Sequence, residues 1–166
     1  MANRIGSLAA GKVIQRMTAT TGVNASLAAL TLGGGPEAAT FVAAQIRAQN
    51  VAADLAERGD AVVYPAVNVY CEKIVNSLVE KFRSFSGTLQ MAVELRASQD
   101  RLSGLQDGLE LYADAVTQVL DANRGDWADG MYYAGGYQVA FSAVKHGGKN
   151  YIQTAKVTFE IGVSIS

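Results

Sequence analysis

Residues 155–165 read Ala-Lys-Val-Thr-Phe-Glu-Ile-Gly-Val-Ser-Ile, and this stretch decides the fold class. Apolar residues alternate with polar or small ones along its whole length, which is typical of a β-strand with one buried face. A run with Tyr137, Val139 and Phe141 precedes it, and Gly147-Gly148 between the two runs supplies the positive φ angles of a tight turn. The sequence therefore predicts a β-hairpin in its last thirty or so residues.

Two more strands are predicted upstream of the hairpin. One lies in residues 61–75, where Pro65 marks the start of the strand or an edge position. The other covers about residues 87–97, where apolar side chains alternate with polar ones. The four predicted strands are enough for one sheet.

The clearest helix is predicted over about residues 103–123. Its apolar residues trace a single stripe, and Ser103 and Gln106 are spaced as a capping box. Asp107, Glu110 and Asp114 fall outside that stripe, on the side predicted to face solvent.

The first 60 residues are rich in alanine and predict helices. Helical spacing covers residues 3–18, a short segment from Asn24 as cap to Leu30, and residues 41–58. Gly33-Gly34-Gly35-Pro36 is the strongest break between them, and Pro36 suits the first position of a helix.

These elements predict an α/β (α+β) fold. We expect a mixed or antiparallel sheet of about four strands flanked by helices. A chain of 166 residues is expected to be a single domain. Within it, residues 1–60 form a helical N-terminal portion, packed on or extending from an α/β body of residues 61–166.

Composition narrows the function. Apolar residues make up 49% and charged residues 17% of the chain, which excludes intrinsic disorder. A net charge of -1 argues against sequence-specific nucleic-acid binding. No apolar run is long enough to span a membrane, and the N-terminus lacks the pattern of a secretory signal. One cysteine excludes an intrachain disulfide and suits synthesis in a reducing cytoplasm.

No residue pattern predicts catalysis. Cys71 falls on the apolar face of a predicted strand and is expected to be a buried structural thiol, because His146 lies in a separate hairpin tip. The glycines at 33–35 are followed by Pro36 and not by the lysine of a phosphate-binding loop. One histidine and one cysteine exclude a zinc site built mainly from those residues. We expect no catalytic, cofactor-binding or metal-binding residues, and no enzyme.

Charge and aromatic placement suggest contacts with other proteins. Six acids and one base lie between residues 107 and 129, whereas Lys145, His146 and Lys149 occupy the predicted hairpin tip. Either both groups are solvated, or the basic tip of one subunit meets the acidic helix of the next. A cluster after the long helix is either a protein interface or part of its own domain; it comprises Trp127, Met131, Tyr132 and Tyr133.

Four stretches resemble the tail terminator proteins of long-tailed bacteriophages. They are Val-Val-Tyr-Pro-Ala-Val-Asn-Val-Tyr-Cys-Glu-Lys-Ile at 62–74, Leu-Glu-Leu-Tyr-Ala-Asp-Ala-Val-Thr-Gln-Val-Leu-Asp at 109–121, and the closing segments at 131–141 and 150–163. The resemblance covers roughly residues 60–166 and consists of structural residues.

This resemblance implies a structural virion protein, assembled in the host cytoplasm and located at the head-proximal end of the tail. Such proteins form a ring, usually a homohexamer, that caps the tube of major tail tube protein, stops its growth and offers a surface for head–tail joining through the connector or neck protein. The family has no catalytic residues and needs no cofactor. The alternatives are a head–tail connector or tail-completion protein and, more remotely, a small hydrolase or nucleotide-binding enzyme.

Overall fold

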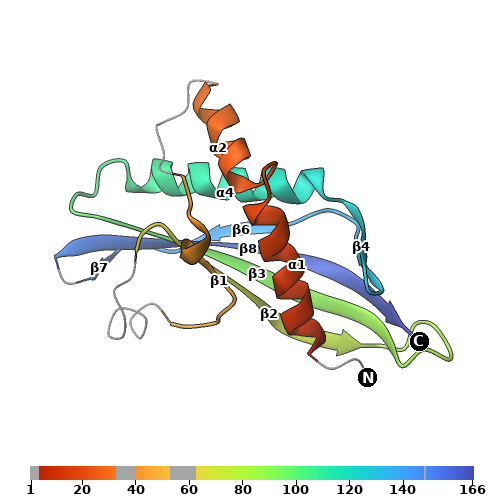
Figure 1. Ribbon diagram of the computed structural model, residues 1–166. Helices are drawn as coiled ribbons and strands as arrows, with labels where there is room; N and C mark the ends of the chain where they lie inside the picture. Colours follow the sequence, from red (N-terminus) through yellow and green to blue (C-terminus); the bar gives the residue numbers. More distant parts are fainter. Residues whose placement is uncertain (1–3, 33–39, 53–62, 148) are drawn as a thin grey trace.

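A curled, mixed sheet of eight strands organises the computed structural model, which describes residues 4–32, 40–52, 63–147 and 149–166 (Figure 1). The strand order is β1-β2-β3-β8-β5-β4, and β6 and β7 also pair with β8. Among the described strands, only β1 and β2 pair in parallel. The strands are β1 Ile46–Arg47, β2 Ala66–Asn76, β3 Phe85–Gln99, β4 Gly125–Ala128, β5 Met131–Tyr133, β6 Gln138–Phe141, β7 Lys145–Gly147 and β8 Asn150–Ile165.

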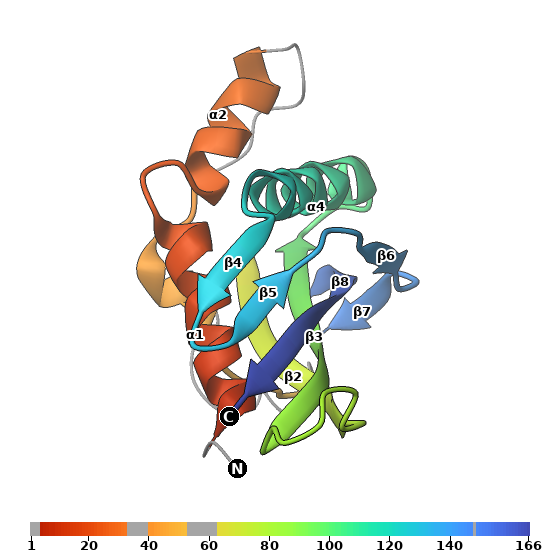
Figure 2. The ribbon, with the colours of Figure 1, turned by 90° about the vertical axis from the view of Figure 1, so that its right-hand side faces the viewer.

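Helices cover one face of this sheet. The described helices are α1 Ile5–Thr18, α2 Val23–Leu32, the short 3-10 helix η1 Ala43–Gln45, and α4 Leu105–Ala122. Helices α1 and α4 pack directly on the strands, whereas α2 packs against α4 (Figures 1 and 2).

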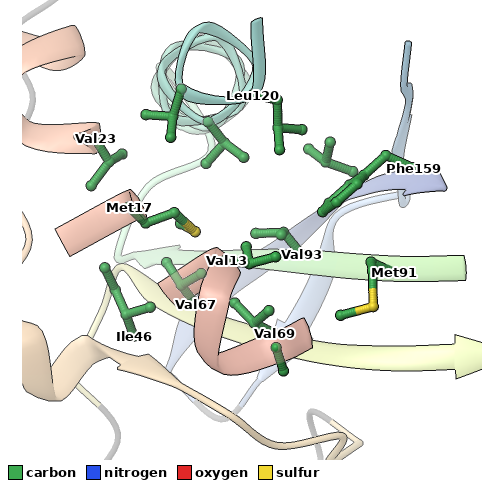
Figure 3. Close-up of a cluster of buried hydrophobic side chains, with 14 of the residues drawn as sticks. Val13, Met17, Val23, Ile46, Val67, Val69, Met91, Val93, Leu120 and Phe159 are labelled. Carbon is green, nitrogen blue, oxygen red and sulfur yellow. The ribbon is translucent and has the colours of Figure 1, made fainter. Parts of the chain in front are cut away.

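The core fills the space between the sheet and these helices. Alternate residues of β8 point into it, and Ala155, Val157 and Ile161 are completely buried. The same cluster includes Val93 of β3, Phe159 of β8 and Leu120 of α4 (Figure 3). Burying each large aliphatic side chain contributes about 1.5–3 kcal/mol. The inward-facing residues of β8 therefore contribute to the stability of the folded protein.

The α+β class is confirmed, as are the strands β2, β3 and β8 and the helices α1 and α4. The sheet is larger than the predicted four strands. Five of its strands have only two to four residues each. Of these, β6 lies in a predicted strand, whereas β1, β4, β5 and β7 are too short to show a period in the sequence.

The predicted helix over residues 41–58 is wrong where the structure describes it. Residues 43–47 form η1 and β1, because Ile46 pairs with Val67 at the edge of the sheet. Asn24 lies inside α2 and does not cap it; its side chain instead holds Phe41 by two backbone hydrogen bonds, of 2.7 and 2.8 Å. Residues 33–36 and 53–58 lie outside the described residues.

The predicted capping box at the start of α4 is also wrong. The N-cap is Gly104, whose φ of 82° is left-handed, and no side chain caps the helix. Gln106 instead donates to Glu110 and accepts a hydrogen bond from Gln153 of β8. Its amide is therefore used to fasten α4 to the sheet.

Candidate functional site

The described residues contain no arrangement suited to metal binding. No three His, Cys, Asp or Glu side chains among them lie together. None of the described helices is long and apolar enough to cross a membrane.

Cys71 and His146 lie far apart. Cys71 pairs with Met91, and the His146 ring contacts Tyr151, which pairs with Gln99. Met91 and Gln99 are eight positions apart on β3 (99 minus 91), or about 26 Å of strand. Cys71 is half-buried rather than buried, and its thiol donates to the Lys73 carbonyl. Burial raises the pKa of this thiol, which disfavours the nucleophilic thiolate.

Three residues of the predicted aromatic interface lie in the core. Trp127, Met131 and Tyr133 are 3%, 1% and 0% exposed, so the interpretation that this cluster packs on its own domain is confirmed for them. The β4–β5 turn reverses the chain and lays the rings of Trp127 and Tyr133 against Phe159 of β8, with centroids 6.5 and 5.5 Å away. Tyr132 points the other way and is 56% exposed.

The predicted charged groups are exposed. Asp107, Glu110 and Asp114 line the outer side of α4, and Lys145, His146 and Lys149 lie at the β7–β8 tip. Within the residues that the structure places, none of these six forms an ion pair. The start of α4 and β7 lie toward the same end of the molecule (Figure 1). A contact between them in different subunits stays a prediction.

An apolar surface that the sequence did not predict lies at the opposite end of the sheet, on the last residues of β2 and the turn between β2 and β3. We name it the apolar tip. Phe82 is 100% exposed there. The only signal in the sequence is the presence of large apolar residues in a short connection that would ordinarily be polar. The apolar tip comprises Ile74, Val75, Leu78, Val79 and Phe82.

Hydrogen bonds give the apolar tip a defined shape. The buried Ser86 accepts from the Glu80 N–H at 3.0 Å, and the Glu80 carboxylate in turn accepts from Ser164 of β8 at 2.8 Å. Leu78 and Phe82 have φ angles of 49° and 65°, a region that costs non-glycine residues about 1–2 kcal/mol each. Strain of this kind persists where the surroundings enforce it, and it often marks a functional surface.

A network of polar side chains lies on the sheet face that the helices leave open. The Tyr70 hydroxyl donates to Glu94 Oε1 at 2.5 Å, and Arg96 Nη2 donates to Glu94 Oε2 at 2.8 Å and to the Val51 carbonyl. Burial and the Glu94 carboxylate raise the pKa of Tyr70 well above its usual value. Both oxygens of Glu94 accept a hydrogen bond, and the contacts of Arg96 with Val51 and of Gln49 with Asn68 fasten residues 49–51 to the sheet.

No protein-family model matches this chain, and no curated protein matches it either.

Proposed function

We propose that this chain is a structural protein that acts by assembling with other protein chains, as the tail terminator of a long-tailed bacteriophage. In this role a ring of copies, expected to be six, caps the tube of major tail tube protein at the head-proximal end of the tail. The observation that carries the proposal is the apolar tip. The resemblance of residues 60–166 to tail terminators gives the class of partner.

The apolar tip suits a protein partner. Monomeric proteins rarely expose large apolar patches, and such patches often mark a site that binds another protein. Aromatic residues are enriched at the centre of protein interfaces, and Phe82 projects fully into solvent. Because the hydrogen bonds of Glu80 and Ser86 already fix the turn, little conformational entropy is lost when a partner binds.

The mechanism is steric. One face of the ring matches a tube subunit and the opposite face does not, so no further tube subunit adds; that second face binds the connector or neck protein. This needs no cofactor and no bond-making step. A head–tail connector or tail-completion protein is the alternative in the same class, and it differs in binding the neck but not the tube.

The test combines the chain with polymerising tail tube subunits. The purified chain should form a discrete multimer by native mass spectrometry and should shorten the tubes in proportion to its concentration. Phe82→Ser should keep the melting temperature, because the side chain is fully exposed, yet require at least about tenfold more protein to stop growth.

The matched control is Leu102→Ser. Leu102 is also exposed but follows the far end of β3, so its loss should leave capping unchanged. A chain that remains monomeric and leaves tube length unaltered would refute the proposal. Binding to a neck protein without binding to the tube would favour the connector.

A further inference from the structure

The sheet has two free strand edges that match each other. Where β6 pairs with β8, the order across the sheet is β2-β3-β8-β6, and the register runs Val69, Val93, Val157, Val139. In the described part of the chain, β6 pairs only with β8. On the other side, β1 covers β2 only at Val67 and Asn68. Among the described residues, nothing pairs with the outer edge of β2 from Val69 onward.

Specific contacts keep the β2 edge open. After β1 the chain turns onto the open face of the sheet, where Gln49 donates to Asn68 at 2.8 Å and Arg96 holds the Val51 carbonyl. This leaves a groove of about 670 Å³ between the start of α1 and residues 48–50. Its apolar lining includes Ile5, Ala10, Val69, Cys71 and Ile74.

The backbone groups on both edges point outward at matching residues. In an antiparallel strand, the N–H and C=O of one residue point to the same side, and successive residues alternate. The bond from Ser142 N to Thr154 O, at 2.8 Å, leaves Val139 and Phe141 of β6 pointing away from β8. The register carried across β8 and β3 leaves Val69 and Cys71 of β2 pointing away from β3.

We propose that β6 of one copy adds as an antiparallel strand to the β2 edge of a second copy, inside this groove. The inference rests on the proposed ring function. Each neighbouring pair in the order β2-β3-β8-β6 is antiparallel, so β2 and β6 run in opposite directions. When β6 of one copy lies beside β2 of the next, the two strands are therefore antiparallel as well. Val139 and Val69 both carry side chains on the helix-covered face, so the pleat continues as well.

A second copy is the occupant because one chain carries both halves of the contact. Joining opposite edges of one sheet is a head-to-tail contact, which generates a closed ring when the rotation closes. β6 contains no charged residue and no proline, the residues that usually prevent an edge strand from pairing with another chain. Phe141 is 40% exposed and would insert its ring beside Ile5 and Ala10.

Crosslinking tests the contact directly. The proposed register sets Phe141 opposite Cys71 of the neighbouring copy, since both residues point outward. Phe141→Cys then brings a second thiol against the native Cys71. Oxidation or a short bismaleimide should then give a ladder of covalent multimers up to the size of the ring. The wild type, with Cys71 alone, and Gln118→Cys on the exposed side of α4 should give none.

A proline substitution tests the hydrogen bonding. Phe141→Pro removes an outward N–H without breaking a bond to β8, and should raise the dissociation constant of the multimer by roughly tenfold or more; Phe141→Ala should raise it less. Unchanged melting temperatures verify folding, and the crosslink remains an independent readout.

The outcomes separate this contact from the ring function. A discrete multimer without the Phe141–Cys71 crosslink overturns the edge contact and leaves the ring. Loss of the multimer on Lys145→Glu with Lys149→Glu, but not on Phe141→Pro, assigns the interface to the charged groups instead. Crosslinks that form only to a different protein overturn the second copy as occupant. Absence of any multimer, alone or with tube subunits, refutes the ring itself.

Discussion

Arg96 shows how a single buried residue shapes an outer edge of the molecule. Its guanidinium is buried, so its desolvation must be offset by close partners. Glu94 supplies the opposite charge and the Val51 carbonyl a second acceptor, while Nε has no partner among the described residues. The hydrogen bond from Arg96 to the Val51 carbonyl holds residues after β1 away from the edge of β2. The buried charge therefore helps to keep open the groove into which β6 of a second copy is proposed to bind.

Tyr133 makes the free energy of unfolding depend on pH in the alkaline range. Its buried hydroxyl donates to the Gly136 carbonyl at 2.9 Å, and burial followed by the charge of Asp121 raises the pKa to about 12. The folded protein therefore favours the neutral phenol. This contribution to stability is complete below pH 10, the ordinary pKa of tyrosine, and is lost as pH rises toward 12.

Urea unfolding at pH 9 and pH 11 measures this effect. The free energy of unfolding of the wild type should fall between the two values, and Tyr133→Phe should fall less steeply because it has no phenol to ionise. Equal slopes for the two proteins would show that Tyr133 does not carry the dependence.

At the scale of elements, length decided what the sequence predicted. Helix α4 and strands β3 and β8 have 15 to 18 residues each, enough to repeat a period several times. Strands β1, β4, β5 and β7 could not be predicted, because they are short and their pairing is set by the surrounding fold. The burial of Trp127 depends on where the β4–β5 turn folds it, and the apolar tip lies in a turn without any period.

The start of α4 gives a prediction at this scale. Ser103→Ala should change the free energy of unfolding by less than about 0.5 kcal/mol, because its hydroxyl makes no cap. Replacing a true capping serine by alanine would lower the free energy of unfolding by about 1 kcal/mol. Gly104→Ala is the comparison and should cost about 1–2 kcal/mol, because φ is 82° there. A larger loss for Ser103→Ala than for Gly104→Ala in urea unfolding would restore the capping box.

At the scale of the whole molecule, α1 joins the two sides of the curled sheet. It packs on β2 and also reaches β4, where Lys12 donates to the Trp127 carbonyl at 2.8 Å and pairs with Asp129 at 2.8 Å (Figure 2). The Arg16 guanidinium lies 4.2 Å from the centre of the Trp127 ring. The curl therefore depends on a helix that is distant in sequence from the strand that it holds.

Lys12→Met tests this role of α1. Methionine keeps the apolar stem but removes both polar contacts, and loss of the partly buried, charge-assisted hydrogen bond to the Trp127 carbonyl should cost about 1–3 kcal/mol. Asp129→Asn should cost under about 1 kcal/mol, because the Asp129 side chain is 60% exposed and the ion pair is screened. Hydrogen exchange should rise in α1 and β4 together in Lys12→Met, since each holds the other. Equal losses of stability in the two variants would show that the ion pair, and not the Trp127 contact, closes the curl. Exchange that rises in only one of the two elements would show that α1 and β4 do not hold each other.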